Sequence, residues 1–248
     1  MSFWTKQSIE RYDAACKLVQ YPKNVIGEKV AEFIRPDDVV MDVGAGCGAV
    51  SAFLSPFCKK IYALESDDFA FEYLQNRVLQ DKLNNVFPIF AQWPSENLPQ
   101  VSIIIGCYVG GLAKTPAQVK SVMDSAQRGG MFLINRDMGF HHLRDEILDR
   151  IGVTPEEDNF SCKSGCQTVG MLSMMGAKVS CHPVTHDFGQ PIQDEEEATH
   201  FLWRKLYIDE RHKKAVRQII EDYITEKDGI PFVPFIRESC LIFFEIEK

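Results

Sequence analysis

Val39-Val40-Met41-Asp42-Val43-Gly44-Ala45-Gly46-Cys47-Gly48 is the stretch that decides the expected fold of this 248-residue chain. Its apolar, mostly β-branched start is typical of a buried strand, and the acid and alternating glycines that follow indicate a sharp turn into a helix over 48–57. Glycine has no Cβ atom to keep a ligand away from the backbone, and it tolerates positive φ. The helix would present free N–H groups at its start. We therefore expect a ligand site at this turn.

A second apolar run, Lys60-Ile61-Tyr62-Ala63-Leu64, ends at Glu65. About 20 residues after the turn, a doubly wound fold places an acid that binds two ribose hydroxyls. A dinucleotide fingerprint, G-x-G-x-x-G, is one interpretation. Here, however, the glycines run G-x-G-x-G, with an acid two residues before the first of them. A glycine-rich turn without a ligand is the other alternative.

Apolar runs alternate with helical periodicity along the first 151 residues, which predicts a parallel sheet with crossover helices on both faces. The expected strands are 39–43, 60–64, 86–91, 101–107 and 131–135. The expected helices are 5–21, 25–34, 49–57, 67–79, 116–127 and 142–151. Further along the chain we expect a strand over 177–186, a helix that begins at the acids 194–197, a helix over 209–225 and a last strand over 239–246.

Asp-Val-Gly-Ala-Gly-Cys-Gly at 42–48, together with Ala-Leu-Glu-Ser-Asp at 63–67, resembles the first two motifs of the class I S-adenosylmethionine-dependent methyltransferases. An acid near the cationic ammonium and sulfonium groups of that cofactor is favourable. The resemblance implies a Rossmann-like doubly wound α/β sheet of seven strands, mostly parallel, with an antiparallel C-terminal strand. It also implies one methyltransferase domain over 1–248, in which 1–35 form a helical lid and 140–176 and 190–225 form a variable cap around the substrate.

By the same resemblance, Asp42, Gly44, Ala45 and Gly46 would line the methionine end of the cofactor, and Glu65 would bind both ribose hydroxyls. The other residues that the resemblance places at the cofactor are Ser66, Asp67, Gln92 and Trp93 near the adenine, Gly106 and Cys107 beside the methyl donor, and Tyr12 from the lid. Gln92 departs from the family, which often has Asp there. Its amide can still hydrogen-bond an adenine edge, and Trp93 can stack on the ring.

Methyl transfer to a small-molecule acceptor, by in-line SN2 displacement, is the expected reaction. The fourth strand ends Ile105-Gly106-Cys107-Tyr108 and lacks the Asp/Asn-Pro-Pro-Tyr/Phe motif of enzymes that methylate base or glutamine nitrogens. Positioning and desolvation can supply most of the rate, so a general base is optional. Its candidates are His141 and His142, and Tyr108 would face the substrate or pack. Two alternatives stay open: a cofactor-binding regulatory or complex subunit without turnover, and, third, an RNA or protein methyltransferase.

Composition narrows the classes of partner. The formal net charge of −8 argues against a broad nucleic-acid surface, which needs clustered Lys and Arg. No apolar run approaches the roughly 18 residues needed to span a bilayer, and the first residues lack a signal-peptide core. We therefore expect a cytoplasmic protein with reduced thiols and a small-molecule acceptor. A homodimer or a protein partner is left open.

Cysteine and histidine spacing raises a metal alternative. Cys162-x-x-x-Cys166, followed by Cys181-His182 and by His186, has the residue types of a zinc site but no standard finger or ribbon spacing. Cysteine is also among the residues most often buried merely in packing. We predict no metal, and the sequence leaves the point undecided.

Overall fold

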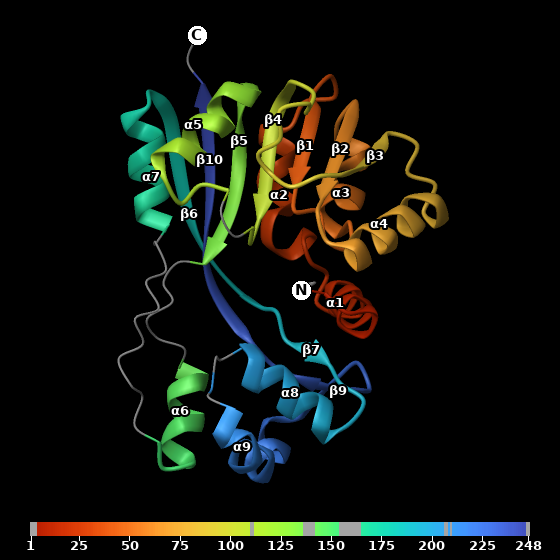
Figure 1. Ribbon diagram of the computed structural model, residues 1–248, viewed down its shortest axis with the longest axis vertical. Coiled ribbons are helices and arrows are strands. Elements are labelled where there is room, and N and C mark those ends of the chain that lie inside the picture. Colours follow the sequence, from red (N-terminus) through yellow and green to blue (C-terminus); the bar gives the residue numbers. More distant parts are fainter. Residues whose placement is uncertain are drawn as a thin grey trace.

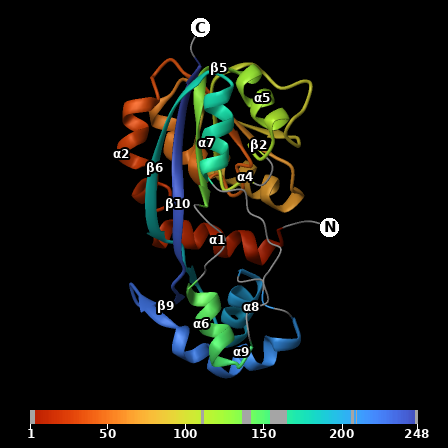
Figure 2. The same ribbon diagram turned by 90° about the vertical axis from the view of Figure 1, so that its left-hand side faces the viewer.

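The computed structural model describes residues 4–109, 112–135, 142–153, 165–205, 208 and 210–246. These residues form a sheet lobe and a cap lobe, and helix α1 (Lys6–Leu18) lies between the two in both ribbon views (Figure 1, Figure 2). Among the described helices, none is long and apolar enough to cross a membrane.

The sheet lobe contains seven strands in the order β3-β2-β1-β4-β5-β10-β6. Their bounds are β1 Val39–Val43, β2 Lys60–Glu65, β3 Val86–Phe90, β4 Val101–Cys107, β5 Ala126–Asn135, β6 Ala177–Asp187 and β10 Ile236–Ile246. Strands β1 to β5 pair in parallel, and β10 lies antiparallel between β5 and β6. This confirms the predicted mostly parallel, seven-stranded sheet with an antiparallel C-terminal strand.

Helices cover both faces of this sheet, as the alternating pattern predicted. The helices α2 Lys23–Phe33, α3 Ala49–Leu54 and α4 Asp68–Gln80 share an apolar core with one face, and α5 Pro116–Ser125 and α7 Gly165–Met174 share a core with the other. Successive residues of β1 contribute to opposite faces: Val40 packs in the α2–α4 core and Met41 in the α5 and α7 core. Two expected helices are shorter than predicted, because α3 gives way to a 3₁₀ turn at Ser55–Phe57 and β5 begins at Ala126.

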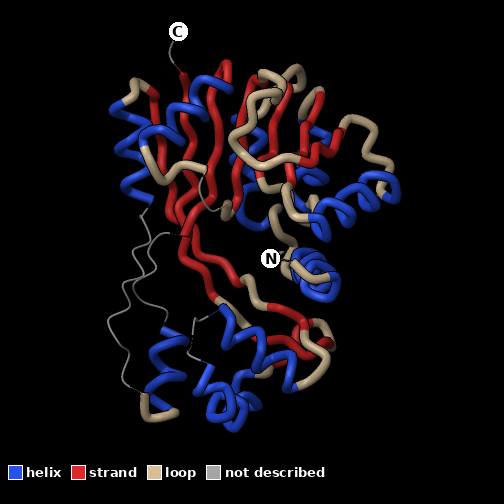
Figure 3. Tube along the Cα trace, viewed as in Figure 1, coloured by secondary structure: helices blue, strands red, loops and turns tan. Residues whose placement is uncertain are grey.

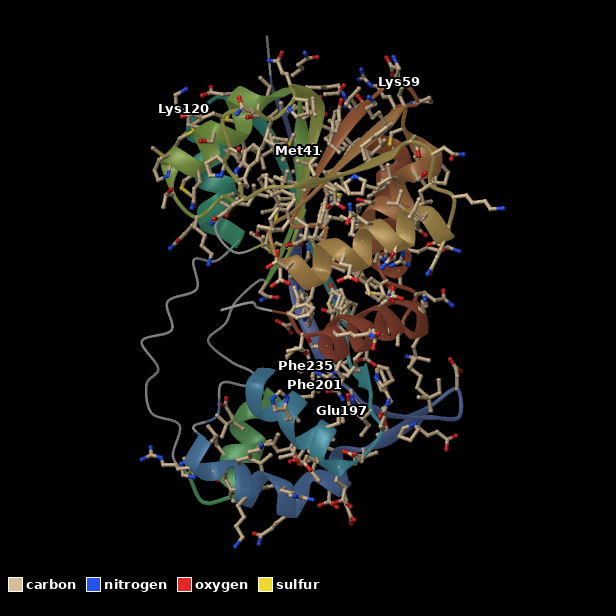
Figure 4. The ribbon with its side chains drawn as sticks, turned by 45° about the vertical axis from the view of Figure 1, so that its right-hand side comes forward. Met41, Lys59, Lys120, Glu197, Phe201 and Phe235 are labelled. Atoms are coloured by element: carbon tan, nitrogen blue, oxygen red, sulfur yellow. The ribbon has the colours of Figure 1, made fainter. Side chains whose placement is uncertain are left out.

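The cap lobe has an apolar core of its own. Its helices are α6 His142–Arg150, α8 Glu195–Lys205 and α9 Lys213–Ile219. They bury Ile147, Phe201, Val216 and Phe235 together, and Figure 4 shows Phe201 and Phe235 side by side below α1, while Met41 marks the middle of the sheet lobe. Helix α7, although it falls in the predicted cap segment 140–176, packs instead on β6 and β10 of the sheet.

A small antiparallel sheet in the cap lobe was not predicted. It contains β7 Gln190–Pro191, β8 Thr225–Lys227 and β9 Ile230–Val233 in the order β7-β9-β8. The dipeptide Asp228-Gly229 joins β8 to β9, and both residues have positive φ, as a two-residue hairpin turn requires. The signal was therefore present in the sequence, but the strands beside it are too short to show period-two alternation. The helix expected over 209–225 is split into 3₁₀ turns at Glu210–His212 and Ile220–Tyr223 on either side of α9.

Strands β6 and β10 connect the lobes. Both continue past the edge of the sheet at which the parallel strands end, and run toward the cap lobe (Figure 3). Their paired residues at that edge include Arg237 opposite His186 and Ser239 opposite Val184. Since ligands of such sheets bind at the carboxyl ends of the strands, the candidate site lies at this edge of the sheet, next to α1.

Candidate active site

The glycine turn between β1 and α3 has positive φ at all three glycines. A Cβ atom on Gly44 would lie 2.8 Å from Val109 Cγ2, and one on Gly48 would lie 2.6 Å from Leu74 Cδ1. The surroundings of Gly46 are different, because the nearest atom to a Cβ there is Gly44 O at 4.0 Å. Gly44 and Gly48 are therefore required by packing, whereas Gly46 leaves open space beside the turn where a ligand can approach the backbone.

The carboxylate of Glu65 is fixed at the end of β2 by three backbone donors. The N–H of Gly46 donates to Oε2 at 2.8 Å, and the N–H groups of Ser66 and Asp67 donate to Oε1 at 2.7 and 2.9 Å. Glu65 thereby ties the glycine turn to the next strand. A carboxylate has about four lone-pair sites, so one bond on Oε2 leaves that oxygen able to accept another donor.

Asp42 lies under the turn and is almost fully buried. Its side chain is on the α3 side of β1, where Ser51 Oγ donates to Oδ2 at 2.6 Å. Burial raises the pKa of Asp42 to about 7, and the charge of Glu65 adds to the rise, while the hydrogen bond from Ser51 opposes it. Asp42 is thus an acid whose charge a nearby cation would stabilise.

The residues predicted near the adenine differ in exposure. Gln92 is exposed, and Trp93 packs against the core that contains Met41. Trp93 Nε1 is buried without an acceptor among the described groups. The carboxylate of Asp67 accepts hydrogen bonds from backbone groups at the starts of two helices. Its Oδ1 accepts from the N–H groups of Phe69 and Ala70 at the start of α4, and its Oδ2 accepts from the Trp4 N–H just before α1.

Gly106 and Cys107, predicted beside the methyl donor, end strand β4. A Cβ atom on Gly106 would collide with the Leu112 side chain, so packing alone accounts for a glycine there. Burial raises the pKa of the Cys107 thiol to about 12, and the charge of Asp42 adds to the rise. Cys107 is therefore a neutral thiol at physiological pH.

Helix α1 brings Tyr12 to the strand ends. The Tyr12 ring packs against Trp4 and Phe188, with centroids 5.2 Å apart in each pair. Burial raises the pKa of Tyr12 well above its ordinary value, and Cys16, Cys47 and Cys107 nearby add to the rise, while the charge of Arg237 lowers it. Tyr12 therefore stands between the glycine turn, the end of β4 and β10.

A buried ion pair holds α1 in this position. Asp13 accepts from Arg77 of α4 at 2.6 Å, from Lys17 at 2.7 Å and from Tyr73 Oη at 2.9 Å. Burial opposes a charge on Asp13, but the hydrogen bond from Lys17 and the charge of Arg77 hold its pKa below the usual range. Arg77 also donates to the Cys47 carbonyl at 2.9 Å, so the same contact reaches the glycine turn. On the cap side, Arg11 pairs with Glu197 at 2.7 Å.

Tyr108, which follows β4 with a φ of 58°, belongs to a polar cluster at the edge of the sheet. Its hydroxyl lies 2.7 Å from Ser239 Oγ and 3.1 Å from His186 Nε2. The guanidinium carbon of Arg237 lies 4.3 Å from the Tyr108 ring centroid. Tyr21 completes the group through a stacked contact with His186, at 6.4 Å between centroids. We refer to these five residues as the Tyr108 cluster.

The sequence alone did not identify most of the Tyr108 cluster. Tyr108 was predicted to face the substrate or pack, and His186 was considered only as a possible zinc ligand. The residues that Tyr108 contacts are 78 and 131 positions away in the chain. The pairing of β6 with β10 would have brought His186 and Arg237 together, but a register is not readable from one sequence.

The two predicted histidines are not placed relative to this site. His141 lies outside the described residues, and His142 opens α6 of the cap lobe without a described side chain. The Tyr12, Asp42 and Glu65 assignments stay predictions, supported by where these side chains lie.

The structure describes only some of the candidate zinc ligands. Cys162 lies outside the described residues, and the side chain of Cys166 is not described. Cys181 and His182 are neighbours within β6, so their side chains point to opposite faces of the sheet. In the described part of the chain, no three potential metal ligands gather.

Comparison with known proteins was made by sequence and by structure. No protein-family model matches the chain. An uncharacterized protein of Methanocaldococcus jannaschii is 29% identical over 108 residues, which are 43% of this chain and 40% of that protein. The match therefore spans less than half of either chain.

Solved structures match over nearly the whole chain at low identity. The YcgJ protein of Bacillus subtilis is 14% identical with a TM-score of 0.60, covering 90% of this chain and 98% of its own. Magnesium protoporphyrin IX methyltransferase of Synechocystis, with bound S-adenosylhomocysteine, is 12% identical with a TM-score of 0.56, covering 97% and 94%. A methyltransferase of Thiobacillus denitrificans in complex with S-adenosylhomocysteine is 12% identical with a TM-score of 0.56. The match covers 99% of this chain and 100% of that methyltransferase. The chain thus has the class I methyltransferase fold.

Proposed function

We propose that the protein transfers the methyl group of S-adenosylmethionine to a small-molecule acceptor. The observation that carries the proposal is the open space beside Gly46, bordered by the fixed carboxylate of Glu65. The fold neighbours that contain S-adenosylhomocysteine support the choice of ligand. The acids of the turn support it as well, because they favour a cation over the pyrophosphate of a dinucleotide.

The side chains present fit this cofactor. Glu65 Oε2, with one backbone donor, would accept from the ribose hydroxyls. Asp42 and the backbone at Gly46 would border the cationic methionine end. Trp93 would border the adenine, and the unpaired Nε1–H gives it a donor for that ring.

The bound cofactor supplies an electrophilic methyl group, and the chain supplies positioning and exclusion of water. Helix α1 covers the strand ends with Tyr12 and is held there by Asp13 and Arg77 on one side and Arg11 and Glu197 on the other. Because both contacts must open to expose the site, α1 keeps the reacting groups aligned and dry. The acceptor would lie between the strand ends and the cap lobe.

A transfer assay tests the proposal. Protein is incubated with methyl-labelled S-adenosylmethionine and with cell extract separated into small-molecule, RNA and protein fractions. We expect label in the small-molecule fraction, abolished by Gly46→Ala and retained in Gly176→Ala, a control with φ of 86° and open space around it. Label in RNA or protein would overturn the choice of acceptor, and cofactor binding without transfer to any fraction would favour a subunit without turnover.

A further inference from the structure

Arg237 lacks a counterion in the part of the chain that the structure describes. It is half-buried, and no described carboxylate pairs with it. Asp187, the acid diagonal to Arg237 across the strand pairing, is opposite Ile236. Asp187 Oδ1 accepts from the N–H groups of Gly189 and Phe235 instead. A guanidinium that is partly removed from water without a carboxylate is costly unless a ligand supplies the negative charge.

Aromatic rings lie close to the guanidinium of Arg237. Its central carbon lies 4.3 Å from the Tyr108 ring centroid and 4.8 Å from that of Phe188. Rings stacked on a planar guanidinium occupy its faces and leave its N–H edges to donate. Such edges match the two oxygens of a planar oxyanion.

Two further polar atoms of the Tyr108 cluster are buried and unpaired. His186 Nδ1 and Tyr21 Oη have no hydrogen-bond partner among the described groups, and their residues are only 7% and 6% exposed. An unpaired buried polar atom is destabilising, and the two rings stack on each other. Buried polar atoms normally have hydrogen-bond partners, so these two atoms and the nearby cation together provide groups that could bind a polar ligand.

The remaining polar groups of the Tyr108 cluster carry no charge at neutral pH. Burial lowers the pKa of His186 to about 4, and the charge of Arg237 adds to the fall, against the opposite effect of Asp187. Burial raises the pKa of Tyr108 above its ordinary value. The cluster therefore presents one positive charge surrounded by neutral donors and acceptors.

We propose that Arg237 binds an oxyanion, carboxylate or phosphate, of the methyl acceptor, with Tyr21 and His186 as neutral hydrogen-bonding partners. The inference rests on the proposed function and adds the acceptor class: a small acidic molecule. Arg237 lies on β10, and strands β4 and β5 separate β10 from β1 and β2, which carry the acids Asp42 and Glu65. The cationic cofactor and the anionic acceptor would therefore bind at opposite sides of Tyr12.

Calorimetric titrations with simple probes test the site. Benzoate, the neutral analogue benzamide and inorganic phosphate are each titrated into the protein saturated with S-adenosylhomocysteine. We expect benzoate or phosphate to bind, with the stronger of the two identifying the oxyanion, and benzamide not to bind. Arg237→Gln should weaken that binding at least tenfold, whereas Arg217→Gln, at an exposed position on α9, should leave it unchanged.

The outcomes separate this inference from the proposed function. Failure of the wild-type protein to bind S-adenosylhomocysteine defeats the proposed function. Normal cofactor binding without any oxyanion binding, or equal oxyanion binding by Arg237→Gln, overturns the acceptor site alone. Weaker S-adenosylhomocysteine binding by Arg237→Gln overturns it too, because Arg237 would then serve the cofactor. If Arg237→Gln does not fold, protection of Arg237 by the bound probe against phenylglyoxal, mapped by mass spectrometry on wild-type protein, decides the point.

Discussion

The two ends of the candidate active site are built in different ways. At the cofactor end, Asp42, Gly46 and Glu65 lie at or just after two consecutive strand ends. The Gly46 N–H donates to Glu65, and the nearby Ser51 hydroxyl donates to Asp42. At the acceptor end, Tyr108, His186 and Arg237 come from β4, β6 and β10 and are joined through side chains. The first end is acidic and the second basic. If both proposals hold, one ligand is recognised by a local turn and the other by residues that the long-range pairing of strands brings together.

Blocking the cofactor end should have the largest effect. Gly46→Ala places a methyl group in the open space of the turn at a φ of 56°. We expect an affinity loss of about 100-fold for S-adenosylhomocysteine, beyond the roughly 1–2 kcal/mol of backbone strain. Calorimetry measures the affinity, and thermal melts measure the strain. Gly176→Ala introduces similar strain elsewhere and should bind normally; equal losses in the two variants would show that Gly46 has no role in binding.

Removing the charge of Glu65 should have the next largest effect. Glu65→Gln keeps the side-chain shape but replaces one acceptor oxygen by a donor, so we expect about a 10- to 100-fold weaker affinity for S-adenosylhomocysteine. The control is Glu226→Gln, at an exposed position in β8 of the cap lobe. Unchanged affinity in Glu65→Gln would contradict the assignment of this carboxylate to the ribose.

The pKa of Asp42, about 7 in the free protein, predicts a pH dependence at the cofactor end. A cationic ligand favours the ionised acid, so a proton must leave on binding below pH 7, and the affinity should fall by about tenfold per pH unit there and level off above it. Titrations from pH 5.5 to 8.5 should show this slope in wild type and not in Asp42→Asn. A flat wild-type profile would place the ligand's cation away from Asp42.

The raised pKa of Asp42 also predicts how the stability of the ligand-free protein depends on pH, and this dependence runs in the opposite direction to that of the ligand affinity. Because the folded-state pKa of Asp42 lies above the unfolded value, its contribution to stability is full below about pH 4 and is lost as pH rises through 7. Ligand-free wild type should therefore lose more thermal stability than Asp42→Asn between pH 5 and 8. Parallel loss in both would mean that the ionisation of another group dominates.

The smallest effect is expected at the acceptor end. Tyr108→Phe removes the hydroxyl that joins Ser239 and His186 but keeps the ring against Arg237. Transfer should slow by a few-fold, since one neutral hydrogen bond contributes about 1 kcal/mol, and cofactor affinity should not change. A loss of cofactor affinity in this variant would show that the two ends are not independent.

The contrast between the ends also explains what the sequence could predict. The strands along the chain, the glycine turn and the position of Glu65 at the end of a strand could be predicted, because each depends on neighbours in the chain or on periodicity. The seven-stranded sheet was expected from the resemblance of the two motifs to a known family. The partners of Tyr108 were not, since they depend on the pairing of β6 with β10 and on the packing of Tyr21 after α1. The small sheet of the cap lobe was missed because its strands have only two to four residues. The occupation of Asp67 by helix ends likewise needed the position of Trp4.

One titration tests the central claim, that the acidic glycine turn binds a sulfonium cofactor. The purified protein is titrated calorimetrically with S-adenosylmethionine, S-adenosylhomocysteine and NADH under the same conditions. The account predicts micromolar binding of the two sulfur ligands and none of NADH, with the affinity for both sulfur ligands about 100-fold weaker in Gly46→Ala. Binding of NADH alone, or of none of the three, would contradict it.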